Sequence, residues 1–462
     1  MRKTTLICGF AACAAVGALS AREFPLTFKP LTCPEAMNLP GGYGATATLQ
    51  TTKPSALKRE PAASAGRALY GELGRVRDSG GILFRLEAAP GGAQGYDRLR
   101  LDLNQNGDLT DDPFVRLADK PQITRAGSSL RETAWFGPVE APPATRIAPG
   151  RPSYYLQLNY YGSQATPGVV RLQSYLGTLR LRPGFYLETT VELGGLRQKV
   201  GVVDGNANFR LGDAAQPVTN RSDTGATWYF PPGDSFLVDR NGSGKFETDR
   251  ADSESSPFGP VLVLGLVPCR AKLAPDCAAL DIEPWPGGSA DLAIQPSKAQ
   301  VRDLALAWER SANDWVLLKT RVSQGHAKVP PGNLRFNGCV LEARTRDGSP
   351  LVLVGTYRKV DKGLGVAAGQ TAALTCGAPL ELQLTAEKRR ATLMPEPSLL
   401  SRAARAPADA VVEIQAEVVG QAGETYGTFL AGKALNAQPP PPRFTVSARD
   451  GREVAAGNLE YG

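Results

Sequence analysis

Apolar and polar side chains alternate with a period of two along much of this chain. In residues 154–161, YYLQLNYY, one face carries Leu156 and Leu158 while the other carries Gln157 and Asn159. Residues 380–384 and 412–418 alternate in the same way. Successive side chains of a β-strand point to opposite sides, so this pattern is typical of strands with one buried face. It predicts a mainly β protein.

Turn residues separate the predicted strands and favour antiparallel pairing. Asp347-Gly348 and Asp450-Gly451 supply the positive φ angles that tight hairpins require. The 50 glycines and 37 prolines exceed the usual combined share of about 12%. Residues 297–318 also fit a helix, but we favour strand there, with a hairpin loop from Ser311 to Asp314. The expected fold class is mainly β, with several antiparallel β-sandwich domains in tandem.

Chain length and composition divide the protein into segments. The 462 residues exceed the roughly 250–300 that one hydrophobic core organises. Stretches rich in alanine and proline at 138–152, 284–298 and 395–409 look like linkers or long surface loops. We therefore expect β domains at 22–145, 151–290, 298–394 and 407–462. The last is short, carries a proline run at 439–442 that suits an exposed connection, and resembles an immunoglobulin-like module.

Residues 1–21 resemble a secretory signal peptide. Arg2 and Lys3 precede a run of small apolar residues, and Ala18 and Ala21 are candidate cleavage positions. An alternative is a lipobox-like sequence in which Cys13 is acylated. No later apolar run approaches the ~18 residues that a membrane-spanning helix needs. We expect a secreted, periplasmic or cell-surface protein with no transmembrane segment.

Export would place five cysteines in an oxidising compartment, where pairing is the usual outcome. Cys269 and Cys277 bracket a short loop, and Cys339 and Cys376 lie in one predicted domain. We favour disulfides within these two pairs, which would leave Cys33 unpaired. The sequence does not fix the pairing.

The charge distribution does not indicate a nucleic-acid partner. The formal net charge of +7 is small for this length, and lysine and arginine are scattered along the chain. The densest basic cluster, residues 388–390, is expected at the solvated end of a strand. A nucleic-acid footprint would require a basic face interleaved with stacking aromatic side chains.

Three acidic segments place oxygen-bearing side chains at alternate positions. The first reads DLNQNGDLTDD from Asp102 to Asp112, the third begins at Asp239, and a fainter middle copy begins at Asp204. In calcium loops, positions 1, 3 and 5 supply side-chain oxygens, position 6 is a turn glycine, and positions 7, 9 and 12 complete the shell. Each segment is expected to follow a strand. The pattern predicts bound Ca²⁺.

These segments resemble the calcium loops of dockerin and EF-hand proteins, without the entering helix of an EF-hand. The resemblance covers about a dozen residues at each site. Position 12 departs from it, because Pro113 and Arg250 replace the family's bidentate acid, and Phe209 replaces the turn glycine of the middle loop. The candidate ligands are Asp102, Asn104, Asn106, Asp108, Thr110, Asp111 and Asp112 in the first loop, Asp204, Asn206, Asn208 and Asp213 in the middle loop, and Asp239, Asn241, Ser243, Lys245, Glu247 and Asp249 in the third.

Ligand charge ranks the three loops, because calcium affinity falls as carboxylates are lost. The first loop has four acids and no adjacent base. In the third loop the negative charge is partly offset by Arg240, Lys245 and Arg250, and the middle loop has the fewest acids. The alternative is that these segments are ordinary turns whose Asp and Asn side chains bond their own backbone, with no metal. We favour calcium for the first loop, and the turn for the middle one.

Other function classes have weaker support in the sequence. The single histidine, His326, sits in a predicted loop, which leaves little for a nucleophilic triad or a zinc site, and we lean against an enzyme. A pair of carboxylates could still serve a glycoside hydrolase. Exposed aromatic residues, Tyr155, Tyr161 and Trp228–Phe230, could form a glycan- or protein-binding module. The leading expectation is an exported, calcium-stabilised protein with a structural or adhesive role in the cell envelope, where a glycan or another protein would be its partner.

Overall fold

Antiparallel β-sheets make up nearly all the regular structure of this protein. The structure is a computed structural model that describes residues 22–62, 68–74, 81–88, 95–126, 129–141, 150–163, 176–193, 195–214, 218–222, 225–229, 233–240, 242–246, 254–295, 299–311, 314–356, 363–390, 410–431 and 439–459. Every strand pair described is antiparallel except β20 with β27. The predicted mainly β class with several antiparallel sheets is confirmed. The predicted signal peptide and Cys13 lie outside the described residues.

Four sheets share one hydrophobic core in the N-terminal half. One has the order β1 (Arg22–Pro25), β19 (Ala279–Pro284), β18 (Val267–Leu273), β17 (Val261–Leu264). A second has the order β3 (Ala45–Thr48), β10 (Gly177–Pro183), β9 (Ser153–Ser163), β8 (Ser129–Glu140), β7 (Gln122–Ala126). The third is β16 (Ser255–Pro257), β15 (Ser235–Val238), β12 (Leu196–Val203), β11 (Phe185–Leu193), β2 (Thr27–Pro30), and the fourth is β4 (Ala68–Leu73), β5 (Ile82–Glu87), β6 (Arg98–Leu101). The hairpin β13 (Val218–Ser222) with β14 (Gly225–Tyr229) and the short helix α1 (Cys33–Met37) complete this half.

Two sheets enclose a second core in the C-terminal half. The larger has the order β22 (Asp314–Arg321), β21 (Gln300–Ser311), β24 (Gly332–Arg344), β25 (Pro350–Thr356), β30 (Thr425–Ala431), β29 (Ala410–Val419), β28 (Glu381–Arg390), and β26 (Leu364–Val366) also pairs with β24. The smaller is β23 (His326–Val329), β20 (Ala290–Ile294), β27 (Thr371–Leu374). A separate hairpin, β31 (Arg443–Ser447) with β32 (Glu453–Asn458), follows the proline run.

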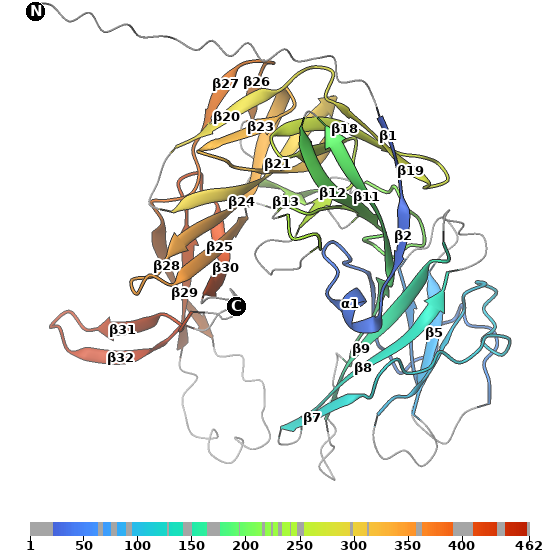
Figure 1. The fold of residues 1–462 in the computed structure, drawn as a ribbon. Helices are drawn as coiled ribbons and strands as arrows, with labels where there is room; N and C mark the ends of the chain where they lie inside the picture. The colour runs from blue at the N-terminus through green and yellow to red at the C-terminus, as the bar shows by residue number, and fades with distance from the viewer. Residues whose placement is uncertain are drawn as a thin grey trace, which may run out of the picture.

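The two halves form an arch (Figure 1). The N-terminal sheets occupy one limb, the green strands β11 and β12 lie near the crown, and the C-terminal sheets form the other limb. The β31–β32 hairpin projects from the end of the second limb. The helix in the described residues, α1, is far too short and polar to cross a bilayer.

Strand pairing joins segments that composition had separated. β8 pairs with β9 and β2 pairs with β11, which links residues 22–145 to residues 151–290. β28 pairs with β29 across the stretch 395–409. The first core accordingly draws on residues from Leu26 to Ile282.

Strand β17 connects the two cores. Val261 and Val263 belong to the C-terminal core, whereas Leu262 and Leu264 belong to the N-terminal core. All four side chains are buried. A strand covered on both faces reads as a continuous apolar run, because no side of it meets water.

The predicted surface loop at 284–298 is wrong. Residues Ala290–Ile294 within it form β20, and Ala290, Leu292 and Ile294 are buried in the C-terminal core. The alternation of these three residues was obscured by the surrounding prolines and glycines. Tertiary burial makes this short segment a strand.

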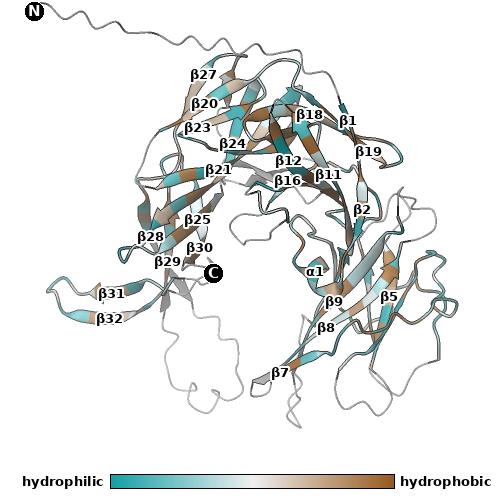
Figure 2. Ribbon diagram, in the orientation of Figure 1, coloured by the Kyte–Doolittle hydropathy of each residue, from teal (hydrophilic) through white to brown (hydrophobic). Residues whose placement is uncertain are grey.

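The predicted hairpins are confirmed. Gly348 has a φ of 84° between β24 and β25, and Gly451 has a φ of 84° between β31 and β32. Within the ambiguous stretch 297–318, the described residues Gln300–Ser311 form β21 and those from Asp314 onward belong to β22, with Ser311 opposite Asp314. Figure 2 shows the alternation of hydrophilic and hydrophobic residues along the strands.

Candidate metal centres

Each acidic loop begins at the residue that follows a β-strand, as predicted. Asp102 follows β6, Asp204 follows β12 and Asp239 follows β15. These aspartates are 2%, 0% and 6% exposed. A carboxylate at this depth requires polar partners, because burying an unpaired charge is costly.

Two backbone amides hold the leading carboxylate in the same way in all three loops. Asp102 Oδ1 accepts the N–H of Asn106 at 3.0 Å, and Oδ2 accepts that of Gly107 at 2.9 Å. The same two bonds recur at Asp204 with Asn208 and Phe209, at 3.1 and 2.9 Å, and at Asp239 with Ser243 and Gly244, at 3.0 and 2.8 Å. A carboxylate has about four lone-pair positions, so each oxygen keeps acceptor capacity.

A shared backbone conformation produces this arrangement. The fourth and sixth residues of the first loop, Gln105 and Gly107, have φ angles of 58° and 77°. The corresponding angles are 53° and 65° at Ala207 and Phe209, and 73° and 79° at Gly242 and Gly244. Left-handed residues at these positions turn the amides of the fifth and sixth residues toward the carboxylate.

Side chains at the third and fifth positions also accept backbone amides. Asn104 Oδ1 accepts the Asn106 N–H at 3.1 Å, and Asn106 Oδ1 accepts the Asp108 N–H at 2.6 Å. In the middle loop Asn206 and Asn208 accept the N–H groups of Asn208 and Arg210, and in the third Ser243 Oγ accepts that of Lys245. These bonds are common to a metal loop and to a metal-free turn.

In the first and middle loops, an acid at the tenth position turns back toward the loop. The twelfth position of these loops carries no acid. Asp111 Oδ2 accepts the side-chain amides of Asn104 at 3.3 Å and Asn106 at 2.9 Å. Asp213 occupies the same tenth position in the middle loop and accepts the side-chain amide of Asn208. The N–H groups of the asparagine amides place partial positive charge next to these carboxylates, as a bound cation would.

Asp112 has a buried oxygen without a partner. The residue is 7% exposed, and its Oδ2 makes no hydrogen bond to any described residue. Burial, followed by the nearby charges of Asp102 and Asp111, raises the pKa of Asp112 to about 6. An ionised carboxylate in this position would be stabilised by a cation shared with Asp102 and Asp111.

Basic residues approach the first loop in space, although none adjoins it in sequence. Arg59 Nη1 lies 3.1 Å from Asp108 Oδ2, and Lys58 Nζ donates to the Asn106 carbonyl oxygen at 3.2 Å. Thr110 Oγ1 donates to Asp108. In a calcium loop the seventh residue contributes its backbone carbonyl, so the Arg59 pair with the Asp108 side chain leaves that ligand available.

The middle loop adopts the full loop conformation although Phe209 replaces the turn glycine. Phe209 is 1% exposed, and its ring packs edge-on against Tyr154 with centroids 4.6 Å apart. A positive φ costs a bulky residue roughly 1–2 kcal/mol. Burial of the ring offsets that cost.

Two residues that the sequence analysis missed, Asp234 and Tyr154, support the middle loop. Asp234 accepts the N–H groups of Gly205 at 3.1 Å, Gly212 at 2.7 Å and Asp213 at 2.8 Å. Tyr154 Oη donates to Asp204 Oδ2 at 2.7 Å. No motif marks these residues, because they come from distant parts of the chain.

Burial raises the pKa values of two acids at the middle loop. The pKa of Asp204 is raised to about 7, mainly by burial, and that of Asp234 is raised well above its usual value by burial and then by Asp204. Asn206 and Asn208 line a cavity of about 220 Å³ with the apolar side chains of Leu73, Ile82 and Leu181. This space is large enough for several water molecules.

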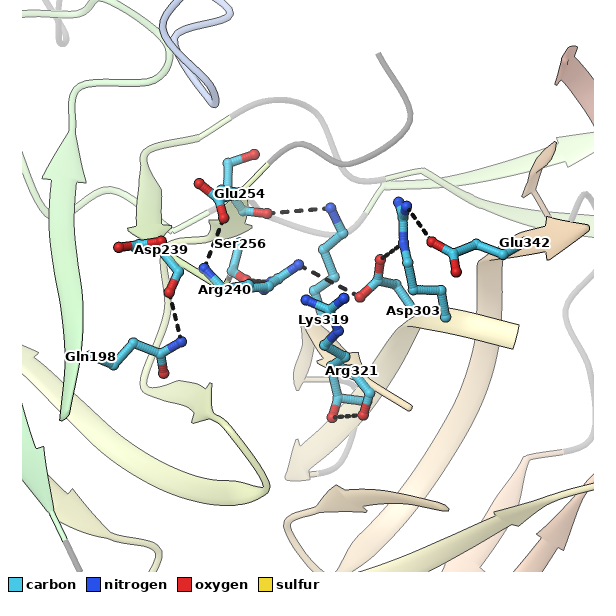
Figure 3. Close-up of polar contacts among 12 residues, drawn as sticks. Gln198, Asp239, Arg240, Glu254, Ser256, Asp303, Lys319, Arg321 and Glu342 are labelled. Atoms are coloured by element: carbon cyan, nitrogen blue, oxygen red, sulfur yellow. Dashed lines mark hydrogen bonds and ion pairs between the residues drawn. The ribbon is translucent and has the colours of Figure 1, made fainter. Parts of the chain in front are cut away.

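The third loop contacts the junction between the halves (Figure 3). Arg240 follows Asp239 directly, and its Nη1 lies 3.8 Å from Asp303 Oδ1 of β21. Its Nη2 donates to Ser256 Oγ at 2.8 Å, and its N–H donates to Glu254 at 2.8 Å. Asn241, Glu247 and Asp249 lie outside the described residues, and Lys245 is exposed. The part of this loop that the structure describes therefore offers one carboxylate.

The donor set consists of oxygens. Among the residues that the structure describes, no three or more His, Cys, Asp or Glu side chains gather into a metal cluster. In the first loop Asp102 and Asp111 bond the backbone and side chains of the loop asparagines, and their charges influence Asp112, but the three carboxylates do not converge into such a cluster. Carboxylate and amide oxygens suit a hard cation that accepts mixed ligands.

The predicted aromatic binding face is only partly exposed. Tyr155 is 8% exposed and donates its hydroxyl to the Leu31 carbonyl oxygen at 3.2 Å, so the prediction that it is exposed is wrong. Tyr161 is half-buried, with Arg131 over its ring at 5.8 Å. The side chains of Trp228, Tyr229 and Phe230 lie outside the described residues.

Comparison with protein-family models, with curated proteins and with solved structures found no match to this chain. The loop geometry is therefore the basis for a functional proposal.

Proposed function

We propose that this is an exported β protein whose strand-end loops bind Ca²⁺, and that it serves a structural or adhesive role in the cell envelope. The observation that carries the proposal is the threefold repetition of one loop geometry, once after β6 and twice after the paired strands β12 and β15 of another sheet. In each loop, amides of the fifth and sixth residues hold a buried leading aspartate, and left-handed residues occupy positions four and six.

The first loop has the strongest support. Asp102 and Asp111 lie near enough to Asp112 for their charges to raise its pKa, and one buried Asp112 oxygen lacks a partner among the described residues. The charges of Asp102 and Asp111 oppose ionisation of Asp112, and a divalent cation bound at this loop would counter that repulsion. Calcium tolerates six to eight oxygen ligands in flexible geometry, whereas magnesium requires a near-ideal octahedron.

A structural role follows from what the loops connect. The Gly107 carbonyl oxygen accepts the N–H groups of Lys58 at 2.8 Å and Arg59 at 3.1 Å, so the first loop holds a distant segment of the chain. An ion that binds only the folded state stabilises it in proportion to the logarithm of its concentration. Extracellular calcium sites of the ~10⁻⁴–10⁻³ M class would then be filled outside the cell.

Calcium titration of the full chain tests the proposal. We expect the melting temperature to rise on addition of millimolar CaCl₂ after chelation, and the Asp112→Asn variant to lose a large part of that rise. Asp119→Asn is the matched control, because Asp119 is an exposed acid that bonds the neighbouring Lys120 amide. An unchanged melting temperature at millimolar calcium would refute calcium binding.

Cell fractionation tests the localisation separately. The protein with residues 1–21 is expected outside the cytoplasm, and a variant lacking them is expected inside it. Equal distribution of the two forms would contradict export and leave the calcium result intact.

The alternative functions have less support. Tyr155 is buried, which weakens a glycan-binding face built on it. Asp204 and Asp234 have raised pKa values, but both are buried and bonded to backbone amides, which is a structural arrangement. We therefore advance the calcium-stabilised structural protein.

A further inference from the structure

Two buried cysteines meet in the C-terminal core. Cys339 lies in β24 of the larger sheet, and Cys376 follows β27 of the smaller sheet. They are 3% and 0% exposed, and both belong to the core that the two sheets enclose. The Cys376 thiol is the first cause that raises the pKa of Cys339, ahead of burial.

Other contacts fix both cysteines around one buried acid. Cys339 Sγ lies 3.2 Å from Tyr426 Oη, which donates to Glu424 Oε1 at 2.8 Å. The N–H of Gly377, the residue after Cys376, donates to the same Glu424 oxygen at 2.5 Å. Glu424 is 0% exposed. Tyr426 and Glu424 therefore connect the sulfur of Cys339 in the larger sheet to the backbone next to Cys376, which follows a strand of the smaller sheet.

The remaining cysteines are placed differently. Cys269 donates its thiol to the Val267 carbonyl oxygen at 3.4 Å, and Cys277 lies in a turn next to Asp276. Burial raises the pKa of Cys269 to about 12 and that of Cys277 to about 11, and no second thiol contributes to either shift. Cys33 begins helix α1 in the other half. All five cysteines are thiols in the structure.

We propose that Cys339 and Cys376 form a single disulfide that joins the two sheets of the C-terminal half, and that the other three cysteines stay reduced. This assignment is independent of the calcium proposal, because no loop residue takes part.

The oxidant is a disulfide compound, either small or protein-borne. One cysteine loses its proton, and its thiolate attacks a sulfur of the oxidant, which gives a mixed disulfide and releases one oxidant thiolate. The second cysteine loses its proton and attacks the mixed disulfide. The Cys339–Cys376 bond forms, the second oxidant thiolate leaves, and the two electrons reside on the reduced oxidant.

The timing of this reaction follows from burial. The neighbouring thiol and burial raise the pKa of Cys339, so the thiolate that exchange requires is scarce once the core has closed. Oxidation therefore occurs during folding. Protein that has folded in the reduced state should resist oxidation, and the formed bridge should resist reductants until the core opens.

Peptide mapping of the full chain tests the proposal. The protein is refolded from denaturant with reduced and oxidised glutathione, labelled with an alkylating agent under denaturing conditions, and digested without reduction. We expect one linked peptide pair containing Cys339 and Cys376, and alkylated Cys33, Cys269 and Cys277. Alkylation of Cys339 and Cys376, or linkage of either to another cysteine, would overturn it.

Reduction of the refolded protein under unfolding conditions provides a second measurement. The reduced protein is expected to melt roughly 5–15 °C below the oxidised protein. Cys339→Ala/Cys376→Ala should melt at the same temperature with or without reductant, whereas Cys269→Ala should keep the difference. If the double variant does not fold, the peptide map of the natural sequence decides the question. A wild-type melting temperature that reductant leaves unchanged would also contradict the bridge.

Discussion

At the scale of the residue, a small number of buried aspartates set the conformation of the acidic loops. Asp102, Asp204 and Asp239 each accept two backbone amides at matching positions. An Asp side chain can do this because it places two acceptors within reach of amides that lie close in sequence. The spacing of these residues was visible in the sequence, and the bonds follow from it.

The raised pKa of Asp112 predicts a pH dependence. Its folded value of about 6 exceeds the usual 3.8, so the neutral form is favoured by folding. Without calcium, the stability from this group is fully present below about pH 4 and is lost as pH rises through about 6. Calcium binding instead requires the ionised carboxylate. Binding should therefore weaken below about pH 6, where Asp112 becomes protonated. Melting curves from pH 4 to 8, with chelator and with calcium, measure both trends.

Asp112→Asn provides the control for this prediction. Asp204 and Glu132 also have raised pKa values, so the wild-type curve contains their contributions. The difference between wild type and variant isolates Asp112. Identical pH profiles for the two proteins would show that Asp112 does not titrate in this range.

Substitutions at Phe209 separate the cost of its positive φ from the stability that its buried ring provides. Removal of its buried ring should destabilise the protein by about 3–5 kcal/mol in Phe209→Ala. Phe209→Gly loses the same contacts but adopts a φ of 65° freely, so it should be more stable than the alanine variant by about 1 kcal/mol. Urea unfolding of both variants measures this order. The reverse order would mean that the positive φ is not retained.

At the scale of the element, burial on one or both faces distinguishes the strands. Strand β9 alternates because one face is covered, whereas β17 is apolar throughout because two cores cover it. Strand β20 was mistaken for part of a surface loop. Its five residues are too few for the alternation to outweigh the prolines and glycines on either side.

Substitutions on the two faces of β17 should destabilise different cores. Leu262→Ala should cost about 2–5 kcal/mol and increase hydrogen exchange mainly in the N-terminal core, for example at β12. Val263→Ala should cost less and act mainly on the C-terminal core, for example at β21. Hydrogen exchange followed by mass spectrometry distinguishes them. The same exchange pattern in both variants would show that the two cores open as one unit.

At the scale of the whole molecule, a buried ion cluster joins the limbs of the arch. Arg240 from the N-terminal half faces Asp303, which Arg302 also contacts at 2.9 Å. Lys319 donates to the Ser255 carbonyl oxygen at 3.4 Å across the same junction. The side chains of Arg240 and Asp303 are 5% and 2% exposed, so water screens the pair very little.

A double-mutant cycle tests the junction. Arg240→Ala or Asp303→Ala leaves a buried partner charge, so each should cost about 3–5 kcal/mol. The double variant should cost less than the sum by about 0.5–3 kcal/mol. Arg270→Ala is the control, because Arg270 pairs with Glu283 at a solvent-exposed site and should change stability by less than about 1 kcal/mol. Urea unfolding measures all four variants, and strict additivity would show that the two charges do not interact.

The candidate site was predictable to the extent that it is local. Asp102, Asn104 and Asn106 were identified from spacing, and the structure places them in one hydrogen-bonded loop. The late acid Asp111 was identified as a candidate ligand, and the structure turns it back toward the loop asparagines. Asp234, Tyr154 and the basic contacts of Arg59 could not be predicted, because no periodicity relates residues brought together from distant strands.

The sequence by itself determined the longer alternating strands, the hairpin turns and the local hydrogen bonding of the acidic loops, but not the short strand β20. These depend on side-chain alternation, glycine dihedral angles and hydrogen bonds between residues a few positions apart. Only the tertiary structure decided that distant segments share two cores, that β17 serves both, and that Cys339 meets Cys376. Such contacts arise from burial between remote segments, and burial is non-directional, so it leaves no spacing in the sequence from which the partner can be identified.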